Sequence, residues 1–193
     1  MPMNTVIIDI SMSLDGFITA ANRTPEEPTG AGGHRLVEWA FGSDEQNRRY
    51  LENAGKDLGA VIAGRETYDT SVPWWGADGP VQRTPVFVVT HQAPAESPEN
   101  GVYTFVTGGI QEALDEARAA AGDRAVAVMG GANLIRQYLA AGLVDEVSLH
   151  VVPVLFGTGT RLFEQFSEEH VHLETLEVVN TPAAIHTRYR VLK

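Results

Sequence analysis

The sequence predicts an α/β protein, a single three-layer domain in which helices flank a mostly parallel mixed sheet that ends in a C-terminal antiparallel hairpin. Short apolar segments rich in β-branched residues alternate with segments of helical periodicity through three quarters of the chain. Several of these apolar segments show no polar alternation, which is typical of parallel strands buried on both faces. The last two strand-like segments have only a Thr181-Pro182 turn between them, which predicts a closing hairpin.

The expected elements follow in regular order over residues 1–193, with no composition shift that would mark a second domain. The first helix would begin after Ser43, because this N-cap candidate stands three positions before Gln46, as in a capping box. Segments 22–34 and 91–101 are rich in Pro, Gly and small polar residues and are expected to be loops. We expect strands at 5–12, 60–63, 85–90, 102–106, 125–129, 146–152, 172–180 and 184–192, and helices at 44–54, 65–70, 110–121 and 132–141.

The composition limits the possible partners. A net charge of −11 and a pI of about 4.9 repel nucleic acid and anionic membranes, so we expect neither as a partner. The absence of cysteine excludes disulfides and thiol catalysis. His170 and His172 have no further ligand at metal-binding spacing, so no metal site is expected. The N-terminal segment has no basic region before its short apolar run, and we expect a cytoplasmic protein that acts on a small molecule.

Two adjacent glycines, Gly130 and Gly131, stand where strand 125–129 meets helix 132–141. A tight turn alone would explain glycines at this place. The alternative is an anion lying against bare backbone at the helix N-terminus, where free N–H groups and the helix dipole favour negative charge. The pair alone does not separate these two interpretations.

A second strand–helix junction has the same layout and favours the anion. Strand 60–63 runs into Gly64, and the first helical turn that follows carries Arg65 and Thr67. A guanidinium can fork onto phosphate, and an arginine in a helix's first turn opposes the helix dipole, so a ligand explains it better than helix stability does. Because the carboxyl ends of parallel strands meet at one edge of a sheet, two such junctions predict an extended phosphorylated ligand such as a dinucleotide.

Asp15-Gly16 follows the first strand at this same edge. Asp-Gly is a common turn pair, so a purely structural turn is one interpretation. The other is a carboxylate that overhangs the ligand cleft and positions a water molecule as the proton source for a reaction. We take Asp15 as the candidate catalytic residue.

Three ordered motifs together resemble the dihydrofolate-reductase-like superfamily, and within it the reductase domain of the bifunctional riboflavin-biosynthesis deaminase-reductases. They are SMSLDGFITA at 11–20, AGRETYDT at 63–70 and VMGGANLIRQYLAAGLVDEVSLHVVPVLFGTGTRLF at 128–163. The resemblance covers roughly residues 4 to 192. It implies a mixed sheet flanked by helices, a nicotinamide dinucleotide phosphate cofactor, and a homodimer.

The resemblance also assigns the cofactor site. It implies that the pyrophosphate lies between the turn of Gly64, Arg65 and Thr67 and the turn of Gly130, Gly131 and Ala132, with a cis peptide bond within the glycine pair. It further implies that the adenosine 2′-phosphate lies near Arg65, Thr90 and His91, with Asn133 where folate reductases often carry an arginine. The segment 154–163 would border the substrate.

The chain departs from the family at the substrate side. Folate reductases carry a carboxylate inside the first long helix, whereas this chain has no clear match around 46–49. Riboflavin-pathway reductases usually carry a lysine at the position of Asp9, which has the opposite charge. The sequence therefore predicts an NADPH-dependent reductase of a small heterocyclic or carbonyl substrate without naming that substrate, and a non-catalytic nucleotide-binding module is the alternative.

Several aromatic and histidine residues have open roles. Trp39, Phe41, Trp74 and Trp75 flank the predicted cleft segments. They are either packing residues or a lid over a flat ring, and the two adjacent tryptophans are expected in a loop. His150, inside strand 146–152, is expected to be a core residue with satisfied hydrogen bonds.

Overall fold

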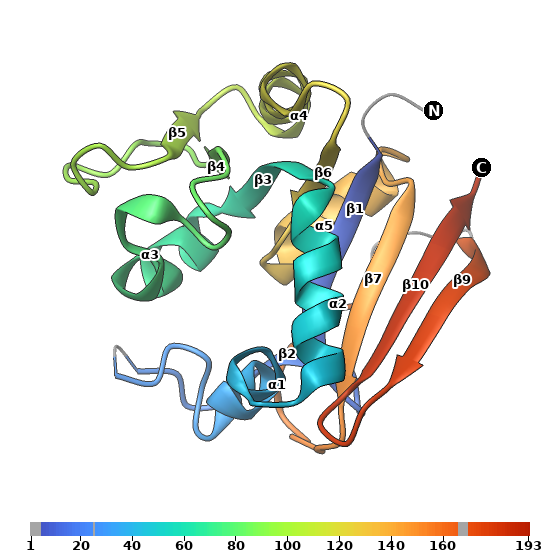
Figure 1. Ribbon diagram of the computed structural model, residues 1–193. Coiled ribbons are helices and arrows are strands. Elements are labelled where there is room, and N and C mark those ends of the chain that lie inside the picture. Colours follow the sequence, from blue (N-terminus) through green and yellow to red (C-terminus); the bar gives the residue numbers. More distant parts are fainter. Residues whose placement is uncertain (1–4, 25, 166–169) are drawn as a thin grey trace.

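The computed structural model describes residues 5–24, 26–165 and 170–193, and its fold confirms the predicted class (Figure 1). The main sheet has eight strands in the order β5-β4-β3-β6-β1-β7-β10-β9, and β2 pairs with β8 in a separate small sheet. The main-sheet strands are β1 (Val6–Ser13), β3 (Leu58–Gly64), β4 (Val86–Val89), β5 (Tyr103–Val106), β6 (Ala125–Val128), β7 (Glu146–Val152), β9 (His172–Asn180) and β10 (Ile185–Leu192), and the small sheet comprises β2 (Phe17–Ala20) and β8 (Gly159–Arg161).

Pairing is parallel from β5 through β7 in the sheet order, and antiparallel between β7 and β10 and between β10 and β9. The predicted closing hairpin is therefore confirmed. The helices are α1 (Glu38–Phe41), α2 (Glu45–Lys56), α3 (Arg65–Trp75), α4 (Ile110–Ala121) and α5 (Ala132–Ala140), with 3₁₀ turns at η1 (Gly33–Leu36) and η2 (Gly76–Asp78). No helix in the described ranges is both long and apolar enough to cross a membrane.

The two faces of the main sheet are covered differently. On one face, α4 and α5 pack against alternate residues of the central strands and form the larger core, which includes Val6, Ile62 and Val128. On the other face, α3 packs over β3 and β4 through Tyr68, and α1 packs over the end of β7 through Trp39. Helix α2 lies in front of this second face (Figure 1). The helix–sheet–helix arrangement thus gives the three expected layers.

Local differences from the sequence-based expectations have simple causes. The expected N-cap at Ser43 is wrong. The N-cap is Asp44, whose side chain accepts a hydrogen bond from the backbone N–H of Asn47, and α2 therefore begins one residue later. Helix α3 continues past residue 70, so Trp74 and Trp75 belong to a helix and not to a loop, even though Pro73 lies inside it. Trp74 is 79% exposed, whereas Trp75 packs against the core beneath α3.

Two short strands were not expected from the sequence. Strand β2 follows the Asp15-Gly16 turn directly, and β8 lies inside the segment 154–163 that was expected to be a loop. Both are only three or four residues long, and they pair with each other across a long sequence separation. Periodicity gives almost no signal over so few residues.

Gly59 in β3 marks the closest approach of the sheet to α4. A Cβ atom placed at Gly59 would lie 2.7 Å from the Ala121 Cα atom, which is helix backbone and cannot rotate away. We expect Gly59→Ala to lower the free energy of unfolding by about 1–3 kcal/mol, as overpacking does. Chemical denaturation measures this change. Gly55→Ala is the matched control, because its Cβ would meet only Val81 Cγ1 at 3.8 Å; equal losses in both variants would contradict the packing explanation.

Candidate functional site

The two glycine junctions are in direct contact. Strands β3 and β6 are parallel neighbours, and the Gly64 amide donates a 2.7 Å hydrogen bond to the Gly130 carbonyl. A Cβ atom at either Gly130 or Gly131 would lie 3.5 Å from Thr67 Oγ1, so the hydroxyl of the first α3 turn lies beside the glycine pair. The structure therefore brings together Gly64, Thr67 and both glycines at the carboxyl edge of the sheet, as the sequence predicts.

The two helices that begin at these glycine junctions lack a side-chain cap. The N-cap residues are Gly64 for α3 and Gly131 for α5, and neither offers a side-chain acceptor to the first helical turn. The first turn of α5 holds the buried Ala132 and the exposed Asn133 and contains no acidic residue. Unsatisfied N–H groups at two adjacent helix N-termini suit a pyrophosphate, so the donor set fits the dinucleotide that the resemblance implies. The Gly130–Gly131 peptide bond is cis, as the resemblance also implies.

Arg65 connects this turn with the end of the neighbouring strand β4. Its Nε atom donates to both carboxylate oxygens of Asp69, at 2.8 and 2.9 Å, and its Nη1 atom donates to the Gln92 carbonyl at 2.7 Å. The Thr90 hydroxyl donates to the same carbonyl at 2.8 Å. His91, which stands between Thr90 and Gln92 in the sequence, is exposed. The predicted cofactor residues therefore all lie along the ends of β4, β3 and β6. Asp69 offsets part of the positive charge that Arg65 brings.

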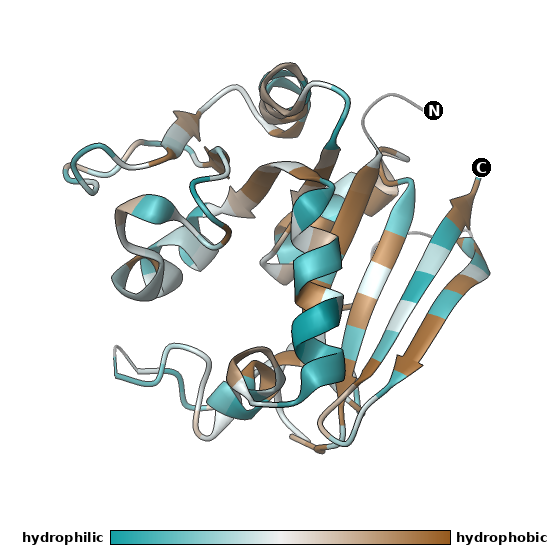
Figure 2. Ribbon diagram, in the orientation of Figure 1, coloured by the Kyte–Doolittle hydropathy of each residue, from teal (hydrophilic) through white to brown (hydrophobic). Residues whose placement is uncertain are grey.

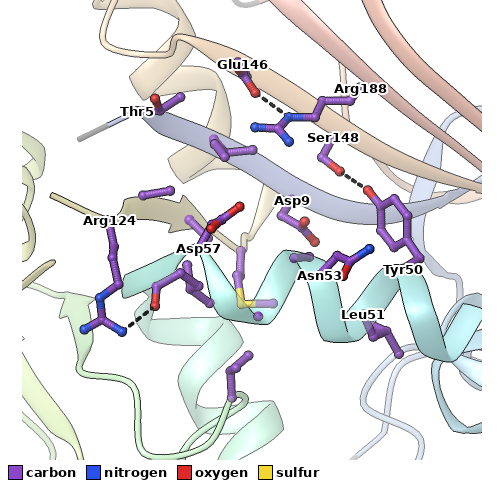
Figure 3. A pocket seen from close by; sticks show the side chains of 18 of the residues that line it. Thr5, Asp9, Tyr50, Leu51, Asn53, Asp57, Arg124, Glu146, Ser148 and Arg188 are labelled. Carbon is purple, nitrogen blue, oxygen red and sulfur yellow. Dashed lines mark hydrogen bonds and ion pairs between the residues drawn. The ribbon is translucent and has the colours of Figure 1, made fainter. Parts of the chain in front are cut away.

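A cleft of about 1030 Å³ lies between α2 and the second face of the sheet (Figure 3). Met129, which immediately precedes Gly130 in the chain, forms part of its wall. Asp9 lies level with Met129 in the strand register, and Asp57 and Arg124 line the cleft at the amino ends of the strands. The cleft thus runs from the candidate cofactor edge across the face of the central strands.

Polar side chains line the cleft from α2 and from β7, beside apolar ones such as Ile7, Ala127 and Met129. Figure 2 shows that α2 is hydrophilic along nearly its whole length, and Asn47 is its one buried residue. Glu146, Ser148 and His150 face α2 from alternate positions of β7.

Hydrogen bonds and an ion pair order the cleft wall. The Tyr50 hydroxyl lies 2.9 Å from Ser148 Oγ, and burial raises the pKa of this phenol above its usual value. Arg188 Nε donates to Glu146 at 2.5 Å (Figure 3). Sequence reasoning missed these residues as site residues. The available signal was the polar alternation in EVSLHVV, which is unusual for a strand near the middle of a sheet.

Asp15 lies in the turn between β1 and β2, and its carboxylate is fully engaged. It accepts hydrogen bonds from Ser13 Oγ at 2.6 Å and from the Phe156 and Gly157 amides at 3.1 and 2.7 Å. These bonds, the one from Ser13 foremost, lower the pKa of Asp15 to about 2. The contacts join the β1–β2 turn to the segment after β7 and favour a structural role. The catalytic role of Asp15 stays a prediction.

The substitution Asp15→Asn distinguishes a structural role of Asp15 from a catalytic one. Asparagine keeps one acceptor oxygen, whereas the carboxylate uses both of its oxygens, so we expect Asp15→Asn to lower the melting temperature at neutral pH. A residue that served only the turn would tolerate this change. Because the pKa of Asp15 in the folded protein lies below the ordinary value of 3.8, the carboxylate stabilises the fold above about pH 4, and this contribution fades as the pH falls towards 2. The difference in melting temperature from the native protein should therefore shrink over that range.

Circular dichroism melts across pH measure the stability effect. Steady-state turnover with the same variant measures the chemical role: a catalytic Asp15 requires a loss of turnover of about 10²- to 10⁴-fold with cofactor affinity retained. A melting-temperature difference that does not change with pH would show that the charge of Asp15 has no part in folding stability.

The fold and the paired glycine turns together define a dihydrofolate-reductase-like α/β domain, which confirms the resemblance seen in the sequence. Within that class the chain belongs to the family described as the RibD C-terminal domain, whose model matches residues 4–187. The Bacillus subtilis protein YyaP is 24% identical over 187 residues, which cover 91% of this chain and 87% of that protein.

Two solved structures show the same fold at low sequence identity. A protein assigned to riboflavin biosynthesis from Shewanella sp. PV-4 superposes with a TM-score of 0.74 at 20% identity, over 98% of this chain and 99% of that one. Dihydrofolate reductase from Enterococcus faecalis, solved in complex with NADP(H) and RAB-propyl, gives a TM-score of 0.62 at 14% identity over 98% and 97% of the two chains.

Proposed function

We propose that the protein is an NADPH-dependent reductase that transfers hydride to a small heterocyclic or carbonyl substrate bound in the cleft beneath α2. The observation that carries this proposal is the contact between two uncapped helix N-termini at Gly64 and Gly131, beside a cleft that begins at Met129. Membership of the RibD C-terminal domain family supports a reductase, and the Enterococcus faecalis relative in fold binds NADP(H).

Each group of residues has a defined task in this proposal. The amides of the two helix N-termini and the Thr67 hydroxyl would bind the pyrophosphate. Arg65, with Thr90 and His91 beside it, would receive the 2′-phosphate. The reduced nicotinamide supplies the hydride. The chain orients the ring towards the cleft and limits the access of water.

Binding and turnover test the proposal separately. Titration with NADPH, followed by fluorescence, measures binding. Loss of the absorbance of reduced nicotinamide in the presence of quinones, pterins or aminopyrimidines measures reduction. Binding with no turnover on any acceptor would favour the nucleotide-binding module instead, and the absence of binding would overturn both.

Gly131→Val should abolish NADPH binding and leave the fold intact. The glycine has ordinary extended backbone angles, and a Cβ would meet Thr67 Oγ1 only at 3.5 Å, so the protein itself has room for a side chain. The branched side chain would instead occupy space beside the proposed pyrophosphate. Fluorescence titration measures the loss. Gly42→Val is the matched control, because Gly42 is also extended, meets no atom closer than 3.5 Å and lies outside the cleft. Normal NADPH affinity in Gly131→Val would remove the phosphate role of this turn.

Arg65→Glu should weaken NADPH binding more than NADH binding. A charge-assisted contact to the 2′-phosphate is worth roughly 1.5–3 kcal/mol, or about ten- to a hundredfold in affinity. Arg83→Glu is a matched control, because Arg83 also donates to a nearby acid, Asp78, and to a loop carbonyl, that of Asn100. Fluorescence titrations of each variant with NADPH and with NADH measure the two affinities. Equal losses of the two affinities would assign Arg65 to the pyrophosphate or to the fold.

A further inference from the structure

Four side chains from four different elements form a continuous hydrogen-bonded row beneath α2. His186 Nε2 lies 2.9 Å from Asn47 Oδ1, His186 Nδ1 lies 3.0 Å from His150 Nδ1, and His150 Nε2 lies 3.2 Å from Asp9 Oδ1. Strand pairing places His186 directly opposite His150, and the neighbouring strand β1 supplies Asp9. Neither the cofactor site nor the Asp15 turn uses these residues.

The row has a closed end and an open end. Asn47 and His186 are each 1% exposed, and the His150 side chain is 4% exposed, whereas the Asp9 side chain is 26% exposed. Asp9 also lines the cleft. A proton held by this row therefore exchanges with the cleft through Asp9.

Aromatic rings enclose the two imidazoles. The Trp39 ring lies 4.4 Å from His150 and 4.6 Å from His186 between centroids, and the Tyr50 ring stacks on His186 at 4.5 Å. Burial, followed by the effect of His150, lowers the pKa of His186 to about 4, so this imidazole is neutral at physiological pH. A neutral imidazole has one donor and one acceptor nitrogen, which gives the row a direction.

Counting donors shows that the open end carries a proton. With Asn47 Oδ1 as the acceptor, His186 donates from Nε2 and accepts at Nδ1, so His150 must donate from its own Nδ1. A hydrogen bond between His150 Nε2 and Asp9 then requires one further proton, shared between the imidazole and the carboxylate.

The Asn47 amide can also take the opposite orientation. Its Nδ2 atom is buried and, among the described residues, has no hydrogen-bond partner that would hold the amide in one orientation. When the amide is turned over, every donor in the row reverses, and neutral His150 donates to ionised Asp9 with no additional proton. The orientation of the buried Asn47 side-chain amide thus determines whether the Asp9–His150 pair carries the additional proton.

We propose that the Asp9–His150 pair is the proton donor of the reduction. This proposal rests on the reductase function proposed above. As the cofactor's hydride reaches the carbon of a C=N or C=O bond, the shared proton passes from Asp9 to the nitrogen or oxygen of that bond, and its σ bond forms as the π bond breaks. The substrate gains H⁻ and H⁺, the cofactor is oxidised, and the pair regains its proton from water in the cleft.

The charges around the pair are mixed. The groups that face it from the surrounding elements are Asp44 and Tyr50 of α2, Glu146 of β7, Glu177 of β9 and Arg188 of β10. Arg188 is paired with Glu146. The carboxylate of Asp9 therefore remains the nearest partner for an imidazolium at His150.

Asp9→Asn tests the pair in the intact chain. The amide still accepts from His150 Nε2 but cannot hold the shared proton. We expect unchanged NADPH affinity, a fall in kcat of at least about tenfold at neutral pH and a changed pH profile of kcat, because the pair can no longer share a proton. The acceptors used are 7,8-dihydropterin for C=N and menadione for C=O. Glu174→Gln is the control, since it removes the same charge from β9 outside the cleft.

A second measurement does not depend on turnover. Nitrogen-15 imidazole NMR of the cofactor-free protein reports the tautomers and the titration of both histidines. We expect His186 to stay neutral down to about pH 5, and the Nε2 resonance of His150 to differ between the native protein and Asp9→Asn because the variant has no shared proton. The more severe variant His150→Gln should lower kcat by about a hundredfold or more.

The possible failures are distinguishable. If the native protein reduces an acceptor and Asp9→Asn keeps both its kcat and its pH profile, the pair is not the acid and the reductase function stands. If the Nε2 resonance of His150 is identical in the native protein and in Asp9→Asn, the shared proton is disproved directly. If the native protein neither binds nor oxidises NADPH, the proposed function fails, and the donor role of the pair fails with it.

Discussion

The hydrogen bond from the Gly64 amide to the Gly130 carbonyl joins the ends of two parallel strands and determines the position of every group at the candidate cofactor edge. A Cβ atom at Gly64 or Gly131 would meet its nearest neighbours at 3.5 Å, so packing within the protein does not require glycine at these two positions, whereas the φ of +116° at Gly130 favours glycine there. The N-termini of α3 and α5 are consequently adjacent, and their dipoles and free amides act on the same volume. Without this contact the two helix starts would be separate, weaker anion sites.

The two faces of the sheet divide the work of stability and recognition. The face beneath α4 and α5 is closed by aliphatic packing and contributes most of the apolar burial. The opposite face of β1, β7 and β10 carries acids, hydroxyls, histidines and arginines, and it is covered by a helix that buries one residue, Asn47. Because stability comes mainly from the first face, the second can keep a large cleft lined by both polar and apolar side chains without loss of the fold.

Sequence periodicity was sufficient for the long elements and for the sheet class, because buried strands such as LGAVIAG and the amphipathic helix α4 carry strong local signals. The glycine turns were also predictable, since a glycine at a strand–helix junction has few structural explanations. The cleft wall was not. His150 was expected to be a core residue with satisfied hydrogen bonds, and it is buried and bonded, but its partners Asp9, Asn47 and His186 come from distant parts of the chain. Local patterns contain no record of such pairings, and the same reason explains why β2 and β8 were missed.

The hydrophilic character of α2 has a consequence for the motions of the molecule. A helix that buries so little apolar surface has a low free energy of local opening, so its amides belong to a foldon of low stability within a rigid domain. Amide hydrogen exchange should therefore be fast along α2 and slow in the strands behind it. A ligand bound in the cleft would contact both α2 and the sheet. It would therefore slow the amide hydrogen exchange of α2 towards the rate measured in the strands. The helix that leaves the cleft open would then also be the part of the chain that reports its occupancy.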